Sequence, residues 1–433
     1  MKRSTLLSSF TALACLAATT LTSAADLAPN NLQGISGVAF HFRTPDTKAF
    51  ADMASIGIGI ARTDMQWVSV EKVQGQYDFS VFDKLADAMI SQGVRPMFIL
   101  DYSNPLYEPV QPGATALDAP IKPPPRHSSS VAAFNNFASA AALHFKGKNV
   151  IWEIWNEPNY TQFWPTGANA QEYGDLAVST CWAIRNVDRD ATIIGPAASA
   201  KDLNFIEAVL ARGVLDCLDG VSVHPYQSAN QPPENAQSNY DQIKALIQKY
   251  ASPERAAHIS IVNSEWGYSA AIGSGVGLDQ QADYIVRQKL LDMSNQLGAS
   301  IWYEWNNDSV NPFDWESNFG ITDSNGNPKM TFTSMRDLAK ELQGALLVGA
   351  LGQLASGDYG LLFRSAAGDD FVVTWSTSAT HTLVTTPSLL MRTTKLIAQR
   401  NGNALALSTR AQLSLLPVTL PFSSSPTKTV LPH

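Results

Sequence analysis

Short apolar runs alternate with longer amphipathic stretches over most of the chain. The apolar runs are rich in β-branched and aromatic residues, as strands are, and lie at 37–42, 58–65, 95–102, 149–155, 192–197, 220–224, 258–264 and 300–305. Between them, apolar residues repeat with a period near 3.6, as in helices, at 79–92, 131–145, 171–187, 203–212, 240–250, 280–297 and 330–342. Strands that are apolar on both faces predict a parallel sheet covered by helices, and eight such units favour a closed (β/α)₈ TIM barrel over an open doubly wound sheet.

The pattern changes at about residue 344. From there the apolar residues follow period two and are separated by turn residues, with strands predicted at 359–364, 371–376, 382–385, 394–399, 404–407 and 412–416. We therefore predict a barrel over 26–343 and an antiparallel β-sandwich domain over 344–433. Because no linker rich in Ser, Thr or Pro separates the two, a sheet packed on the barrel is favoured over a tethered sugar-binding module.

The N-terminal segment 1–25 has the features of an export signal. A basic start at Lys2 and Arg3 precedes a mostly apolar stretch, and small residues end at Ala25. This pattern predicts a periplasmic or extracellular protein. An alternative is a lipoprotein site at Cys15, which is weakened because Ala12 stands where Leu is usual.

Charge and cysteine content exclude several classes of function. The formal net charge is −8 and no basic cluster is present, which argues against nucleic acid or anionic membrane surfaces as partners. No glycine-rich nucleotide loop follows a strand, and after the signal no apolar run approaches the roughly 20 residues of a membrane span. Cys181 and Cys217 either form one disulfide or remain two buried thiols, and neither has metal-ligand spacing. We expect a monomer with a saccharide substrate and no metal or cofactor.

Polar side chains follow the predicted strands at their carboxyl ends, the end of a TIM barrel that carries the active site. They are His41, Arg62, Asp64, Asp101, Asn156, Glu157, His224, Tyr226, Glu265 and Glu304.

Two of these strand ends present a glutamate beside aromatic residues. The run 149–155 stops at Asn156 and Glu157 because Pro158 has no N–H to continue a ladder, and the run 258–264 stops at Glu265. Two carboxyl groups that face each other across a barrel mouth are the catalytic groups that glycoside hydrolysis needs. One acts as the acid and the other as nucleophile or base. Glu304 also ends a strand between aromatic residues and is the rival for the second position.

These motifs resemble a known enzyme clan. The segment Trp-Asn-Glu-Pro at 155–158, with Glu265 and with His-Pro-Tyr at 224–226, is similar to the retaining glycoside hydrolases of clan A. Within the clan, Trp-Asn-Glu-Pro-Asn at 155–159, Asn-Phe-Gly-Ile at 318–321, Asn-Pro-Lys at 327–329 and the appended β domain most resemble family 39. That family includes β-xylosidases, α-L-iduronidases and bacterial endoglycosidases that act on biofilm exopolysaccharide.

The resemblance implies catalytic roles residue by residue. Glu157 matches the acid/base and Glu265 the nucleophile of a double displacement. Asn156 matches the residue that binds the sugar 2-hydroxyl. Arg62 matches an arginine that supports the nucleophile, although from the sequence it also has Asp64 as a simpler partner.

The remaining positions are expected to bind substrate. His224 and Tyr226 match groups that flank the two glutamates, and Glu304 is expected to hydrogen-bond the sugar. Trp302 matches the aromatic floor and Trp164 is a second stacking candidate. His41 either faces a ligand or is satisfied in the core. Glu153 is interpreted as a structural partner of an inward-facing Arg or His.

The sequence thus predicts an exported retaining glycoside hydrolase that cleaves β-linked polysaccharide. Endo action on bacterial exopolysaccharide is modestly favoured over an exo-acting β-xylosidase. A non-catalytic sugar-binding barrel is the third reading, and the presence of both glutamates with their supporting Asn and Arg argues against it.

Overall fold

A computed structural model describes residues 27–112, 122–351 and 357–377. The predicted signal at 1–25, the alternative site at Cys15 and every strand predicted after residue 377 lie outside these ranges. Within them, no helix is both long and apolar enough to cross a bilayer.

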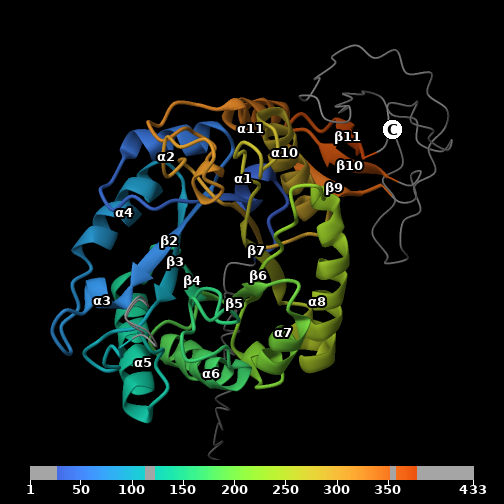
Figure 1. Cartoon of the computed structure of the whole chain (residues 1–433). Helices are drawn as coiled ribbons and strands as arrows, with labels where there is room; N and C mark the ends of the chain where they lie inside the picture. The colour runs from blue at the N-terminus through green and yellow to red at the C-terminus, as the bar shows by residue number, and fades with distance from the viewer. Residues whose placement is uncertain (1–26, 113–121, 352–356, 378–433) are drawn as a thin grey trace, which may run out of the picture.

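Eight parallel strands close into a barrel in which each strand pairs with its neighbours in chain order and β8 pairs back with β1 (Figure 1). The strands are β1 (Ser36–Ala39), β2 (Ile60–Gln66), β3 (Arg95–Asp101), β4 (Ile151–Ile154), β5 (Thr192–Ser199), β6 (Gly220–His224), β7 (Ser260–Trp266) and β8 (Ala299–Trp302). The predicted TIM barrel is therefore confirmed, and each of its strands overlaps a predicted run.

Helices surround the barrel. They are α1 (Leu32–Ile35), α2 (Thr47–Ser55), α3 (Trp67–Val70), α4 (Ser80–Ser91), α5 (Ser128–His144), α6 (Ala170–Val187), α7 (Leu203–Leu210), α8 (Gln237–Tyr250), α9 (Pro253–Ala256), α10 (Leu278–Ser294) and α11 (Met330–Glu341), with 3₁₀ turns η1 (Val214–Asp216), η2 (Pro233–Ala236) and η3 (Glu316–Asn318). The apolar outer faces of the strands and the inner faces of these helices form one large core.

Inside the barrel, apolar side chains cluster separately from that outer core. Ile60, Ile151 and Ile301 are among its members, and all three are almost fully buried. Since successive strand residues point to opposite faces, Arg62 and Glu153, two positions further along β2 and β4, also point inward. The amino end of the barrel interior is thus apolar, and its carboxyl end is polar.

The described C-terminal part is a small antiparallel sheet with the order β11-β10-β9. Its strands are β9 (Leu346–Ala350), β10 (Asp358–Arg364) and β11 (Asp370–Ser376). In Figure 1 it lies beside α10, and Trp375 Nε1 donates to Glu234 Oε1 at 2.8 Å. The prediction of a packed sheet is confirmed for these strands. β9 was not predicted because its residues are apolar or glycine throughout, so apolar and polar positions do not alternate along it.

Cys181 and Cys217 form a disulfide that ties α6 to the segment after η1. Both cysteines are buried. Of the two states left open by the sequence, two free thiols is therefore wrong.

Candidate active site

Arg62 is the centre of the polar network at the barrel mouth. Its guanidinium donates from Nε to Glu153 Oε2 at 2.7 Å, from Nη1 to Glu265 Oε2 at 2.7 Å and from Nη2 to Asn156 Oδ1 at 2.8 Å. Burial alone would lower the pKa of Arg62, but the two carboxylates reverse this effect and raise it. The guanidinium therefore stays charged and, from β2, holds one side chain on β4, one just beyond β4 and one on β7.

This arrangement decides two open interpretations from the sequence. Glu153 is fully buried and pairs with Arg62, as its inward parity predicted. Asp64 pairs with Arg43 rather than with Arg62: Asp64 Oδ2 accepts from Arg43 Nη2 at 3.3 Å. Arg62 is thus free to hold Glu265.

Glu265 carries the strongest set of stabilising contacts among the mouth carboxylates. Oε2 accepts from Arg62, and Oε1 accepts from the Tyr226 hydroxyl at 3.0 Å. Burial by itself would raise the pKa of Glu265, but the charges of His224 and Arg62 and the hydrogen bonds from Arg62 and Tyr226 outweigh it and lower the pKa. An ionised carboxylate that is still 14% exposed is suited to attack a substrate.

Glu157 sits on a strained turn just beyond β4. Its φ is 47°, in the left-handed region that non-glycine residues rarely adopt, and Trp155 (70°) and Ala197 (53°) share this conformation. The backbone N–H of Glu157 donates to the carbonyl of Ala197 at 3.0 Å, which holds the turn against β5. Such strain is often stored at functional sites, and here it directs the carboxylate into the mouth.

His224 links Glu157 to the rest of the site. Its Nδ1 lies 2.9 Å from Glu157 Oε1, and the ring is fully buried. Burial would lower the pKa of His224, but Glu265 and Glu157 together raise it. When protonated, His224 places positive charge close to both glutamates.

The two predicted catalytic carboxylates face each other. One oxygen of Glu157, one oxygen of Glu265 and one ring nitrogen of His224 all lie within 4.8 Å of one another. Three such groups are also a set that a metal ion can use, but Arg62, Tyr226 and the His224 contact already occupy these atoms with protein partners. The geometry therefore fits a catalytic carboxylate pair better than a metal centre.

Asn156 is held on both sides of its amide. Oδ1 accepts from Arg62, and Nδ2 donates to the hydroxyl of Tyr102 at 3.0 Å. Tyr102, which directly follows β3, thus orients the Asn156 amide. Its ring also stacks on Phe163, with ring centres 5.8 Å apart.

His41 and Glu304 form a second pair on the β8–β1 side of the mouth. His41 Nε2 lies 3.2 Å from Glu304 Oε2, with the His41 side chain 46% exposed and that of Glu304 nearly buried. Burial raises the pKa of Glu304 to about 7, although His41 opposes the shift. The pKa of His41 is raised because Glu304 outweighs burial. His41 is therefore a mouth residue rather than a core histidine.

Two predicted stacking residues do not reach the mouth. Trp302 and Trp164 are fully buried, and their indole N–H groups donate to Phe319 O at 3.0 Å and Glu172 Oε2 at 3.4 Å. The prediction that they stack on a sugar is wrong in this structure. The reason for Trp302 is strand parity: Ile301 points into the barrel, so Trp302 points outward to the helices.

Tyr303 is the aromatic residue that the sequence reasoning missed. It packs on the inner apolar cluster and is only partly buried, with its ring centre 5.6 Å from that of His41 and 5.4 Å from that of Phe319. Tyr303 shares the parity of Ile301, but the sequence alone does not show which parity of this run faces inward. Further out, on the connection between β8 and α11, Trp315 is 46% exposed.

Comparison with known proteins agrees with this geometry. The family model described as Cellulase (glycosyl hydrolase family 5) matches residues 23–309. A curated β-xylosidase from Geobacillus stearothermophilus is 23% identical over 237 residues, and the match spans 48% of this chain and about half, 46%, of that relative.

Solved structures share the fold. A family 39 glycoside hydrolase from Bacteroides cellulosilyticus has a TM-score of 0.68 and 24% identity, covering 81% of this chain and 71% of that one. A family 39 β-xylosidase from Caulobacter crescentus has a TM-score of 0.54 and 18% identity, covering 79% of each chain.

The matched region contains all eight barrel strands and both facing glutamates, and it extends over more than half of the chain. The chain therefore belongs to the clan A glycoside hydrolases that this cellulase-type model describes.

Proposed function

We propose that the protein hydrolyses β-glycosidic bonds with retention of configuration. The observation that carries this proposal is the approach of Glu157 and Glu265, which have oxygens within 4.8 Å of each other. Retaining enzymes place their carboxyl groups about 5–5.5 Å apart, whereas inverting enzymes need about 6.5–9.5 Å to admit a water.

The reaction follows as a double displacement. In the first step the Glu265 carboxylate attacks the anomeric carbon, the glycosidic bond breaks, and Glu157 gives its proton to the departing oxygen. In the second step Glu157 takes a proton from water, the water oxygen attacks the anomeric carbon, and the ester to Glu265 breaks.

The surrounding residues prepare both glutamates for these steps. Arg62 and Tyr226 keep Glu265 ionised before attack and stabilise it again when it leaves. His224 positions Glu157 through the 2.9 Å contact. Asn156, whose amide is oriented by Arg62 and Tyr102, is the proposed partner of the sugar 2-hydroxyl, where contacts strengthen as the oxocarbenium-like transition state forms.

Within the clan we assign the chain to family 39 and propose a polysaccharide substrate, with bacterial exopolysaccharide as the first candidate. Exposed Phe313 and Trp315 beside the mouth support endo action, because flat apolar rings can stack on successive sugars. The second candidate is an exo-acting β-xylosidase, supported by the name of the curated relative. A sugar-binding barrel without activity is disfavoured by the complete arrangement around Glu157 and Glu265.

Export of the protein is also a proposal. It rests on the signal-like segment 1–25 and is supported by the Cys181–Cys217 disulfide, since disulfides persist in oxidising compartments. Mass spectrometry of the mature N-terminus distinguishes cleavage near Ala25 from lipidation at Cys15.

The test of the mechanism is the stereochemistry of the first product. A panel of aryl glycosides and polysaccharides identifies the sugar, and proton NMR during hydrolysis then follows the anomeric signals. We expect the β anomer to appear first, and first appearance of the α anomer would overturn the double displacement.

A further inference from the structure

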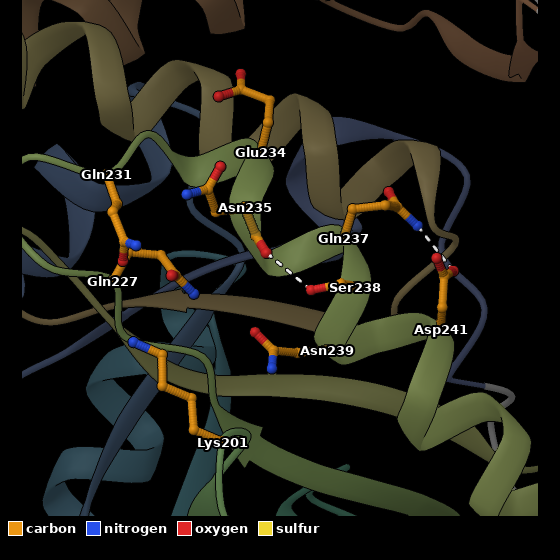
Figure 2. A pocket seen from close by; sticks show the side chains of 9 residues that line it. All are labelled: Lys201, Gln227, Gln231, Glu234, Asn235, Gln237, Ser238, Asn239 and Asp241. Carbon is orange, nitrogen blue, oxygen red and sulfur yellow. Dashed lines mark hydrogen bonds between the residues drawn. The ribbon is translucent and has the colours of Figure 1, made fainter.

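A polar pocket opens beside the proposed active site, over the segments that follow β5 and β6 (Figure 2). Its volume is about 620 Å³, within the range of about 300–1,000 Å³ typical of small-molecule sites. Its lining residues are Lys201, Gln227, Gln231, Glu234, Asn235, Gln237, Ser238, Asn239 and Asp241.

The lining consists of amides, a hydroxyl, one ammonium and two carboxylates, with no aromatic residue. Among the described residues, the Lys201 ammonium and the side-chain amides of Gln231 and Asn235 have no hydrogen-bond partner. Figure 2 shows these three side chains around the same hollow. An amide both donates and accepts, as a sugar hydroxyl does, so the pocket offers unused groups that match an uncharged saccharide.

The acidic groups of the pocket are already engaged. Glu234 accepts from Arg287 Nε at 2.8 Å and from Trp375 Nε1 at 2.8 Å, and Asp241 Oδ1 accepts from Gln237 Nε2 at 3.0 Å. The carboxylates therefore act as supports of the wall. What remains is the Lys201 ammonium and neutral amides, which suit a ligand with hydroxyl oxygens as acceptors better than a cation.

The pocket wall is held in place by the neighbouring elements. Tyr268 after β7 donates from its hydroxyl to Gln231 O at 2.9 Å, and Asn239 Nδ2 donates to Ala200 O at 3.3 Å. Trp375 of β11 donates to Glu234 of η2, so the C-terminal sheet contacts this turn as well. These contacts fix the backbone of the wall, and the exposed side chains of Lys201 and Asn235 stand on it.

The chain connects this pocket directly to the proposed catalytic residues. Gln227 follows Tyr226, whose hydroxyl bonds Glu265, and Lys201 follows Ala200, whose N–H donates to His224 O at 3.0 Å. The pocket is thus next to the site and on the same face of the barrel.

The side of the mouth indicates which part of a substrate the pocket receives. In a closed barrel of eight strands in chain order, β5 and β6 lie across from β1 and β2. Glu157, which gives its proton to the departing oxygen in the proposed reaction, is bonded to Ala197 of β5 and to His224 of β6. The β5–β6 side is therefore the side of the units that depart with the glycosidic oxygen.

We infer that this pocket is a leaving-group subsite for an uncharged saccharide chain. The inference rests on the proposed function and deepens it, because a subsite on the leaving-group side contributes only when the substrate continues beyond the cleaved bond. Lys201, Gln231 and Asn235 supply the recognition.

The test uses the full-length protein and the double variant Lys201→Ala/Asn235→Ala. Two substrates share the sugar that the wild type cleaves: a neutral oligosaccharide of several units and its aryl monosaccharide glycoside. We expect the ratio of kcat/KM, oligosaccharide over aryl glycoside, to fall about tenfold in the variant, as the loss of two hydrogen bonds implies. The matched control is Gln242→Ala, an exposed position of α8 outside the pocket lining, which should leave the ratio at the wild-type value.

The possible outcomes distinguish failure of the proposed subsite from failure of the proposed reaction. A variant ratio equal to that of the wild type, with the wild type active on both substrates, overturns the leaving-group subsite and leaves the proposed function standing. A wild-type protein that cleaves no glycoside of the panel overturns the proposed function itself. Circular dichroism shows whether the double variant is folded. If it is not, the same kcat/KM ratio measured on the single variant Asn235→Ser tests the subsite.

Discussion

The protein contains two buried charged networks that differ in how far their side chains are exposed to solvent. At the barrel mouth, Arg62 holds Glu153, Glu265 and Asn156, and the Glu265 side chain remains 14% exposed. On α10, outside the barrel, Arg287 pairs with Glu234 and is only 8% exposed.

The α10 network continues in two further groups that are sealed from solvent. Lys289 Nζ donates to Ser300 O and to Gly37 O, and Asp292 accepts from Tyr240 and Asn263 at 2.7 Å each. Every one of these contacts joins the helix to a strand of the barrel or to α8.

One buried pair on α10 differs from Glu265 in whether burial or charge controls the pKa. For Lys289 and Asp292 burial prevails: it lowers the pKa of Lys289 to about 7 and raises that of Asp292 to about 6. At the mouth, the charges of His224 and Arg62 outweigh burial, and the pKa of Glu265 is lowered. Glu265 keeps a low pKa because two positive groups face it, whereas the charges of Lys289 and Asp292 offset the effect of burial only in part.

The largest effect expected from breaking the mouth network is loss of turnover. Glu265→Gln removes the nucleophile and Glu157→Gln removes the acid, so each should lower kcat at least about 10³-fold. Melting temperatures should stay close to that of the wild type, since both side chains are partly exposed. Steady-state kinetics on an aryl glycoside measure the effect. Glu304→Gln is the control, and if it abolishes activity while Glu265→Gln does not, the nucleophile is wrongly assigned.

The next largest effect concerns the α10 network and acts on stability. Arg287→Met leaves the Glu234 carboxylate buried without its cation, which should lower the free energy of unfolding by about 3–5 kcal/mol. Urea denaturation measures this loss. Aryl glycoside turnover by the folded variant should remain near the wild-type rate. The double variant Arg287→Met/Glu234→Gln should regain part of the stability, and a marked fall in turnover would show that the two networks are coupled.

The smallest effect is a shift in the pH profile. Tyr226→Phe removes a hydrogen bond that lowers the pKa of Glu265, so that pKa should rise. Activity requires ionised Glu265 and is lost as the pH falls through its pKa, so the acid limb of kcat/KM should move to higher pH, with a loss of about tenfold at neutral pH. Tyr268→Phe, which lacks contact with Glu265, is the control. An unmoved acid limb in Tyr226→Phe would remove Tyr226 from this role.

Part of the site was predictable because the sequence marks where the strands end. Pro158 and the abrupt change from apolar to polar residues located Glu157, and the same change located Glu265. Counting the strands placed both on one rim of the barrel. The inward parity of Glu153 predicted a buried cation partner, and Arg62 provides it.

The aromatic residues were not predictable in the same way. In a strand buried on both faces, an apolar side chain carries no mark of the face to which it points. Trp302 was therefore chosen over Tyr303, although the inner cluster contains Ile301 and contacts Tyr303. Tyr102 and its contact with Asn156 depend on how the chain leaves β3, which no local pattern specifies.

The sequence by itself determined the barrel, the position of both glutamates on its rim and the change to an antiparallel sheet, because hydrophobic period and strand-ending residues are local properties. Only the tertiary structure decided that Arg62 holds Glu265 and Glu153 together, that Cys181 reaches Cys217, and that a polar pocket lies beside Tyr226. These features depend on distances between segments far apart in the chain, and closure of the barrel sets those distances.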